Sequence, residues 1–438
     1  MFFASLFFII ELLVYFLIKD LLLGDPDFHA TILIGMNMLF VIFCLLKFNK
    51  KIMTILLFGF FIRICAMYWD IYAFEIFKLP HSGADSVGFY ESALVVSSDL
   101  SRLEGYIYGG LYSKVLGVLL YLGPVSRITL QYLNILVSMF SIILIYKTMV
   151  QLMLKPIIRD RLVLLMILFP SSIIFSSILL REAIIAFLVT LSLYIFMKWV
   201  QTGAYRMVFL STAVCLLGAL FHSGVISLVV GYMIMILFYK PKKKIFKVTF
   251  QTFIIFAVLL STTTILTYIP LENIAIFDKF THALDKNDDI STIASTGSGG
   301  SVYLVNIAMD NPLVFILFAP IKMFYFIASP VPLNWRGLMD IITFFYDSIF
   351  YIILFIGPLF AIRKHGTSLK KHPIILSLII ILLVSLFIFG ISLNNAGTAM
   401  RHRYKFFFLF ILLFGLVFNV VSKNKEYRIV KNENLTIK

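Results

Sequence analysis

Charged residues are scarce in this chain. Only 13% of its 438 residues are Asp, Glu, Lys or Arg, while 61% are hydrophobic; soluble domains carry about 25% charged residues. This composition excludes an ordinary soluble globule. Cysteine is also rare, and Cys44, Cys65 and Cys215 lie within hydrophobic runs at no metal-like spacing. Neither a disulfide framework nor a metal site is therefore predicted.

Signatures for soluble activated donors are missing as well. The sequence has no Walker-type glycine loop, no dinucleotide-binding fingerprint and no His-Glu-x-x-His zinc motif. We predict no cofactor. A substrate for group transfer would have to arrive already energised, in or at the membrane, which points to a lipid-linked donor.

Long apolar runs dominate what is present. They recur along the whole chain with lengths of about 17 to 25 residues, each sufficient to cross a bilayer core of about 30 Å as a helix. We predict an all-α polytopic membrane protein forming a single integral membrane domain over residues 1–438. About twelve spans are expected, near residues 2–18, 30–46, 52–72, 128–148, 162–179, 183–199, 206–221, 224–239, 248–268, 341–362, 373–392 and 405–422.

Positive charges are grouped between these runs. With a cytoplasmic N-terminus, the predicted cytoplasmic segments carry most of the 37 basic residues and few of the 22 acids, as the positive-inside rule requires. The net charge of +15 is thus explained by orientation, and we expect no nucleic-acid partner. Both termini are predicted to be cytoplasmic, with residues 423–438 as a solvated tail.

Two apolar stretches break this charge pattern if they are counted as spans. Residues 106–123 contain Lys114, and residues 312–335 contain four prolines. We predict that both are interfacial or re-entrant elements on the outer face. They belong to two long outer loops, 79–127 and 269–340. The second loop includes the Gly/Ser-rich residues 296–301, which fit either the hinge of a lid or a slack connector.

Two candidate sites on the outer face contain acids. Asp85 lies in the first outer loop, where a carboxylate at the membrane surface fits a general base or a solvated loop aspartate. Arg181 and Glu182 occupy a tight turn between two predicted spans. A charged pair at this boundary must be satisfied. Arg181 fits a phosphate ligand and Glu182 a base, or the two fix the turn through neighbouring groups.

Two further candidate sites contain imidazoles and cations. His222 lies in another short outer turn, as an oxyanion donor or as a packed or capping histidine. Arg401, His402, Arg403 and Lys405 lie together where the predicted topology is outside. This placement opposes the orientation rule. Arginine forks match phosphate oxygens, although snorkelling toward lipid headgroups is the alternative.

Three charged residues fall within predicted spans, namely Glu11, Arg63 and Asp70. Such residues usually face the interior of a helix bundle. We expect Glu11 and Arg63 to pair across the first and third spans. Asp70, near the outer end of its span, is a further candidate for the site.

The outer-face motifs together resemble a known type of enzyme. An Asp followed by a Tyr in a long first loop, continuing to Leu122–Arg127 before the next span, resembles membrane glycosyltransferases of the GT-C type. Residues Phe169–Ala183, the His-Ser turn at His222 and residues Gly397–Tyr404 resemble bacterial O-antigen and capsular polysaccharide repeat-unit polymerases. The resemblance covers most of the chain in organisation, through short and degenerate motifs.

This resemblance implies a substrate and a place of action. The substrate class is glycan on undecaprenyl pyrophosphate, joined at the outer face of the bacterial cytoplasmic membrane without nucleotide sugar. Separately, the outer-face residues show no cluster of metal ligands, so we predict that the reaction is independent of metal. The family's outer-face arginines bind pyrophosphate, which implies this role for Arg401, Arg403 and Arg181, with His402 and Lys405 beside them. Membrane lipid and the flippase and chain-length regulator proteins of the same pathway are the implied partners.

The resemblance also implies a base. An acid in the first loop of GT-C enzymes activates the acceptor hydroxyl, which here implies Asp85. Many of these enzymes have two adjacent acids, whereas Asp85 lies between Ala84 and Ser86. Glu182 and His222 therefore stay open as alternative catalytic residues.

Three other functions remain open at this point. The first is a GT-C transferase that uses a polyprenyl-phosphate donor. Its product carries one added sugar, whereas a polymerase makes a ladder of repeat units. A flippase or transporter of lipid-linked oligosaccharide would place charges through the midplane and show matched halves, whereas most polar groups here lie on one face. Acyl transfer would make His222 the natural base.

Overall fold

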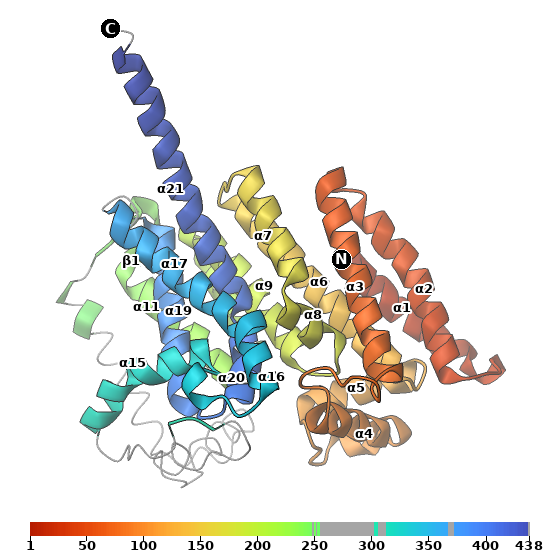
Figure 1. Cartoon of the computed structure of the whole chain (residues 1–438). Helices are drawn as coiled ribbons and strands as arrows, with labels where there is room; N and C mark the ends of the chain where they lie inside the picture. The colour runs from red at the N-terminus through yellow and green to blue at the C-terminus, as the bar shows by residue number, and fades with distance from the viewer. Residues whose placement is uncertain (248, 251, 255–301, 305–311, 367–371, 437–438) are drawn as a thin grey trace. The chain divides into compact units, whose positions relative to one another are not determined.

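The computed structural model describes residues 1–247, 249–250, 252–254, 302–304, 312–366 and 372–436 (Figure 1). These residues are nearly all helical. One short antiparallel hairpin is described, in which β1 (Tyr239–Lys240) pairs with β2 (Ile245–Phe246). The all-α polytopic fold predicted from the apolar runs is confirmed.

Within the described residues, eight helices are long and apolar enough to cross a membrane. The exact count of twelve is not confirmed. Two predicted spans, 206–221 and 224–239, correspond to shorter apolar helices, and a third, 162–179, is broken into two pieces. The predicted span 248–268 lies almost entirely outside the described residues, as does the Gly/Ser-rich segment 296–301.

The chain divides into two compact units, Met1–Thr190 (unit 1) and Leu191–Lys438 (unit 2). This division neither supports nor opposes the prediction of one integral membrane domain, which stays a prediction. Unit 1 contains the following helices: α1 (Phe2–Ile18), η1 (Lys19–Leu21), α2 (Pro26–Leu45), α3 (Lys50–Tyr72), α4 (Ala84–Ser98), η2 (Leu100–Leu103), α5 (Leu111–Leu122), α6 (Arg127–Gln151), α7 (Pro156–Leu168), α8 (Pro170–Ser177) and the start of α9 (Glu182–Thr202).

The predicted first outer loop, residues 79–127, contains α4 and α5, which pack against each other at one end of the long helices of unit 1 (Figure 1). With 12 residues, α5 is about 18 Å long, too short to cross the bilayer core alone. This length agrees with the prediction that residues 106–123 do not span.

A helix break in unit 1 has a clear cause. Between α7 and α8, Phe169 has an extended backbone and Pro170 begins the next helix, since proline cannot continue the preceding hydrogen-bond ladder. Arg63 of α3 satisfies the carbonyls that the break exposes. Its guanidinium donates to Ile167 O (3.3 Å), Met166 O (3.4 Å) and the hydroxyl of Ser172 (2.9 Å).

The expected ion pair between Glu11 and Arg63 is therefore wrong. Arg63 serves as a buried cap of the broken helix, while Glu11 Oε2 accepts a hydrogen bond from the amide of Asn37 (2.8 Å). Tyr132 of α6 donates to the same amide's oxygen (2.9 Å). This buried network joins α1, α2 and α6.

Unit 2 contains the rest of α9 and the following helices: α10 (Tyr205–Phe221), η3 (Ser223–Val225), α11 (Ile226–Phe238), η4 (Pro241–Lys243), α15 (Pro312–Ala328), η5 (Pro332–Asn334), α16 (Leu338–Thr343), the π-helical η6 (Phe344–Ser348), α17 (Ile349–His365), α19 (Pro373–Ser392), α20 (Ala396–Tyr404) and α21 (Phe407–Thr436). In this unit, α15, α16 and α20 gather at the end opposite the C-terminus (Figure 1). By the predicted topology this end is the outer one.

Candidate functional site

Asp85 lies in the first turn of α4, and its carboxylate is fixed by a tyrosine. Tyr108 donates its hydroxyl to Asp85 Oδ1 at 2.6 Å. Gly88, one turn along α4, permits this approach, because an added Cβ would lie 2.7 Å from Cε1 of Tyr108. The half-buried carboxylate is therefore held by this tyrosine at the start of α4 in unit 1. Tyr108 is not among the site residues predicted from the sequence.

The turn that carries Arg181 and Glu182 is fixed from α6. Asn134 donates its amide to Ile178 O and Leu180 O, both at 3.0 Å, which are the carbonyls just before the turn. Glu182 is fully buried, while Arg181 is half-buried. The two hydrogen bonds from Asn134 pair the backbone carbonyls of this turn, and a buried carbonyl without a partner would lower stability.

The charges of this turn affect the pKa of a tyrosine in α5. Burial raises the pKa of the Tyr112 hydroxyl, Glu182 raises it further and Arg181 lowers it. The same hydroxyl accepts from the amide of Asn134 at 3.3 Å. The charges of Arg181 and Glu182 therefore both act on the Tyr112 hydroxyl within unit 1.

Asp70 has a defined partner that the sequence did not reveal. Its Oδ2 accepts from Arg127 (3.2 Å) and from the amide of Gln131 (2.7 Å). Arg127 also donates to the hydroxyl of Ser86 (2.6 Å). The side chain of Asp70 is fully buried and that of Arg127 is 20% exposed. This centre ties α3 and α4 to the start of α6.

In unit 2, two segments far apart in sequence bring their histidines together. The rings of His222 and His402 meet edge to face with centroids 4.6 Å apart. Both pack on Phe389 of α19, at 5.6 Å and 5.3 Å. Gly224 makes room for this arrangement, because an added Cβ would overlap the ring of Phe389. Both histidines are half-buried, so they are accessible to small polar groups.

The hydrogen bond of His222 bears on its chemical role. The backbone N–H of Gly224 donates to His222 Nδ1 at 3.2 Å. A ring nitrogen that accepts is unprotonated, so in the neutral ring Nε2 carries the proton. His222 therefore offers a donor rather than a base at Nε2. This favours contact with an anionic oxygen over the alternative of a catalytic base.

The cations of the predicted cluster fall into two groups. Arg401 is half-buried, next to His402 on α20. Lys405 is buried, with its ammonium 5.8 Å from the ring centre of Phe389. Arg401, His402 and His222 thus form the accessible part, which we call the α20 cluster.

Arg403 has a different environment from Arg401. It is fully buried, forms an ion pair with Asp347 of η6 and lies over the ring of Tyr351 at 5.1 Å. Its other hydrogen bonds go to the end of α15 and to η6, namely to Phe326 O (3.4 Å), Ile327 O (2.8 Å), Ser329 O (2.7 Å) and Ser348 Oγ (3.0 Å).

A contact between Arg403 and pyrophosphate would need an exposed guanidinium, but the guanidinium of Arg403 is fully buried in this structure. A side chain with 0% exposure and five acceptors cannot reach a substrate without leaving them. We infer that Arg403 instead positions α20, the helix that carries Arg401 and His402. Sequence could not distinguish the two arginines, because they differ by their partners on other helices.

Taken separately, the two units offer different chemistry. The candidate site of unit 1 has carboxylates oriented by tyrosine, arginine and amide groups. That of unit 2 has an arginine and two imidazoles that suit an anion. Among the described residues, no group of three or more His, Cys, Asp or Glu could hold a metal ion.

Residues 100–283 match a family model. The model is described as dolichyl-phosphate-mannose-protein mannosyltransferase and covers less than half of the chain. The matched segment contains Arg181, Glu182 and His222 but not Asp85, Arg401 or His402. The searches of curated proteins and of solved structures found no match. The family match supports the coarser prediction, a GT-C-type membrane glycosyltransferase.

Proposed function

We propose that this protein polymerises glycan repeat units carried on undecaprenyl pyrophosphate at the outer face of the bacterial cytoplasmic membrane. The observation that carries the proposal is the contact of His222 with His402, which is next to Arg401 on α20 in unit 2. Positive and N–H donor groups gathered at the outer face suit a pyrophosphate, which carries more negative charge than a sugar or a headgroup monoester.

The reaction is a substitution at the anomeric carbon. A hydroxyl oxygen of the acceptor glycan forms the new glycosidic bond while the bond from the anomeric carbon to the pyrophosphate oxygen breaks. The pyrophosphate leaves with the bonding electrons, and the acceptor proton passes to a carboxylate. Arg401, His402 and His222 Nε2–H stabilise the charge on the leaving pyrophosphate, each donor contributing about 2–4 kcal/mol by analogy with oxyanion donors.

Asp85 is our candidate for the proton acceptor. It is half-buried and oriented by Tyr108, whereas Glu182 is fully buried. We therefore propose a structural role for Glu182 at the α8–α9 turn. Arg181, half-buried at the same turn, stays our candidate phosphate ligand within unit 1. Lys405 contributes a long-range positive charge rather than a direct contact.

The family match favours a second function. A model named for dolichyl-phosphate-mannose-protein mannosyltransferase matches residues 100–283, and enzymes so named take a sugar from a polyprenyl monophosphate. A transferase of this kind adds one sugar and makes no ladder of products.

The deciding experiment uses purified protein in lipid nanodiscs. It is supplied with a fluorescently labelled repeat unit on undecaprenyl pyrophosphate, and in parallel with a polyprenyl-phosphate sugar and the same acceptor. A ladder of repeat units from the first donor alone supports polymerisation. A single added sugar from the second donor, with no ladder from the first, replaces our proposal by the monophosphate-dependent transferase.

A further inference from the structure

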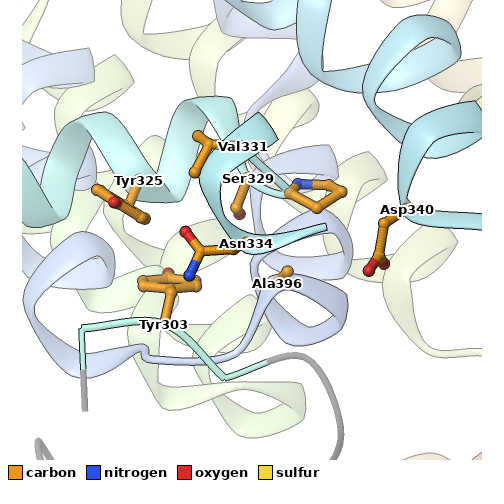
Figure 2. A pocket seen from close by; sticks show the side chains of 8 residues that line it. Tyr303, Tyr325, Ser329, Val331, Asn334, Asp340 and Ala396 are labelled. Carbon is orange, nitrogen blue, oxygen red and sulfur yellow. The ribbon is translucent and has the colours of Figure 1, made fainter. Parts of the chain in front are cut away.

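Beside α20, unit 2 has a small hollow that the α20 cluster does not include (Figure 2). Tyr303, Ser329, Asn334 and Asp340 are among the residues that line it. The free space is about 220 Å³ including its mouth, and the enclosed part is about the size of one water molecule. The enclosed part thus has room for one hydroxyl, and the rest of a larger group would lie outside it, at the opening.

The floor is polar and unsatisfied. The hydroxyl oxygens of Tyr303 and Ser329 and the amide oxygen of Asn334 are buried, and they have no hydrogen-bond partner within the part of the chain that the structure describes. Tyr303 is 2% exposed and Ser329 1%. Figure 2 shows these three side chains pointing into the same space. Buried polar atoms of native proteins are normally paired, so the space is built for a group that both donates and accepts.

The rim combines rings with a fixed carboxylate. Tyr325 lines the hollow half-exposed, with its ring 5.2 Å from that of Tyr303. Pro330, which also lines the hollow, accepts at its carbonyl oxygen from the indole N–H of Trp335 (3.1 Å). Asp340 Oδ2 accepts from the backbone N–H of Arg336 (2.9 Å), which fixes the carboxylate on the opposite side of the hollow from Tyr325 (Figure 2).

The hollow is physically continuous with the segment that leads into α20. Ala396, the first residue of α20, lines it. Tyr303 N–H donates to Asn394 O (2.8 Å), and Val302 forms a bridge with Asn395. On the other side, Ser329 O accepts from Arg403. A group bound in the hollow would therefore lie close to the residues that position Arg401 and His402.

We infer that this hollow binds one neutral pyranose residue of the glycan, with a single sugar hydroxyl inserted among Tyr303, Ser329 and Asn334. A hydroxyl donates and accepts at once, as this floor requires. The ring of Tyr325 at the rim covers the apolar C–H face of a sugar, and Asp340 accepts from a second hydroxyl. The identity of the ligand as part of the glycan rests on the proposed function. The inference adds the residues that select the sugar.

The test is saturation-transfer-difference NMR on the full-length protein in nanodiscs. The probes are methyl glycosides of glucose, galactose, mannose and N-acetylglucosamine. At least one should receive saturation from the protein, and Tyr303→Phe and Asn334→Ala should each weaken its binding about tenfold or more, as the loss of one buried hydrogen bond predicts. Asn334→Asp, which keeps an acceptor oxygen, should retain more of the binding than Asn334→Ala.

A matched variant separates this inference from the proposed function. Arg401→Ala should keep sugar binding while it abolishes the product ladder. If sugar binding is intact but no ladder forms from any donor, the polymerase is wrong and the sugar subsite stands. If no glycoside is bound, or if Tyr303→Phe and Asn334→Ala bind as the wild type does with unchanged melting temperature, the subsite is overturned whatever the polymerase does.

Discussion

Arg403 and Asp347 form a fully buried ion pair that joins α20 to the π-helical turn η6. The pair is accompanied by hydrogen bonds from Arg403 to Ile327 O and Ser329 O at the end of α15. One guanidinium therefore connects three elements of unit 2. Arg403 lies two residues after Arg401 on α20, so the geometry of the α20 cluster depends on the contacts of Arg403.

Breaking this pair should destabilise unit 2 strongly. Arg403→Ala leaves a buried carboxylate at Asp347 without its partner, which costs about 3–5 kcal/mol. Replacing both residues, as Arg403→Met with Asp347→Leu, should cost much less, because no buried charge is left. Thermal unfolding of both variants in the same detergent measures the difference. Equal destabilisation would show that the ion pair is not what holds α20.

Arg401 should affect activity and not stability. Arg401→Ala removes a donor to the pyrophosphate and should lower the rate of ladder formation about 100-fold or more, with the melting temperature unchanged. Arg363→Ala, an exposed arginine at the end of α17, is the matched control and should retain wild-type activity. If both variants polymerise equally well, Arg401 has no part in the reaction.

Gly224 should be intolerant of any side chain. Gly224→Ala forces a methyl group into the ring of Phe389, and such overpacking costs about 1–3 kcal/mol. The shift should disturb the contact of His222 with His402. A second substitution, Phe389→Leu, should restore part of the stability by releasing the overlap. A Gly224→Ala protein with an unchanged melting temperature would contradict the packing described here.

Asn134 should hold the Arg181–Glu182 turn. Asn134→Ala removes the donors to Ile178 O and Leu180 O, and a buried unsatisfied group costs about 1–3 kcal/mol. Reduced melting temperature and faster hydrogen exchange at residues 178–182 are expected. The nearby buried Ser138 provides the control, since Ser138→Ala removes no hydrogen bond recorded among the described residues. Equal exchange in the two variants would count against this role.

His372 should make stability depend on pH. Burial lowers the pKa of this histidine from its ordinary value near 6.5, and Lys423 lowers it further. The folded protein then binds fewer protons than the unfolded chain just below pH 6.5. Stability is complete above that value and falls as the pH drops toward the lowered pKa. His372→Gln should flatten thermal stability between pH 5 and 6.5; an unaltered slope would assign the dependence to other groups.

The sequence predicted the helical spans well because length and hydropathy encode them directly. The helix break at Pro170 was missed, although proline marks it, because the apolar run continues on both sides. The role of Arg63 as a cap depends on carbonyls more than 100 positions away, and no local pattern contains that information.

Candidate residues were predicted better than their roles. The motifs at His222 and at residues 401–405 identified segments that do come together in unit 2, but their proximity follows from helix packing around Phe389. The burial of Arg403 depends on Asp347, which lies inside an apolar run and gave no signal. Tyr108 and Arg127 were missed for the same reason, since each acts through a partner in another helix.

The central claim is that Arg401 and its neighbours face the outer side of the membrane. Position 401 should be tested as Arg401→Cys in a protein whose Cys44, Cys65 and Cys215 are replaced by alanine, with Lys364→Cys as the cytoplasmic reference. A membrane-impermeant maleimide added to intact cells should label position 401 and spare position 364. Labelling of position 364 with protection of position 401, reversed once the membrane is permeabilised, would contradict the account.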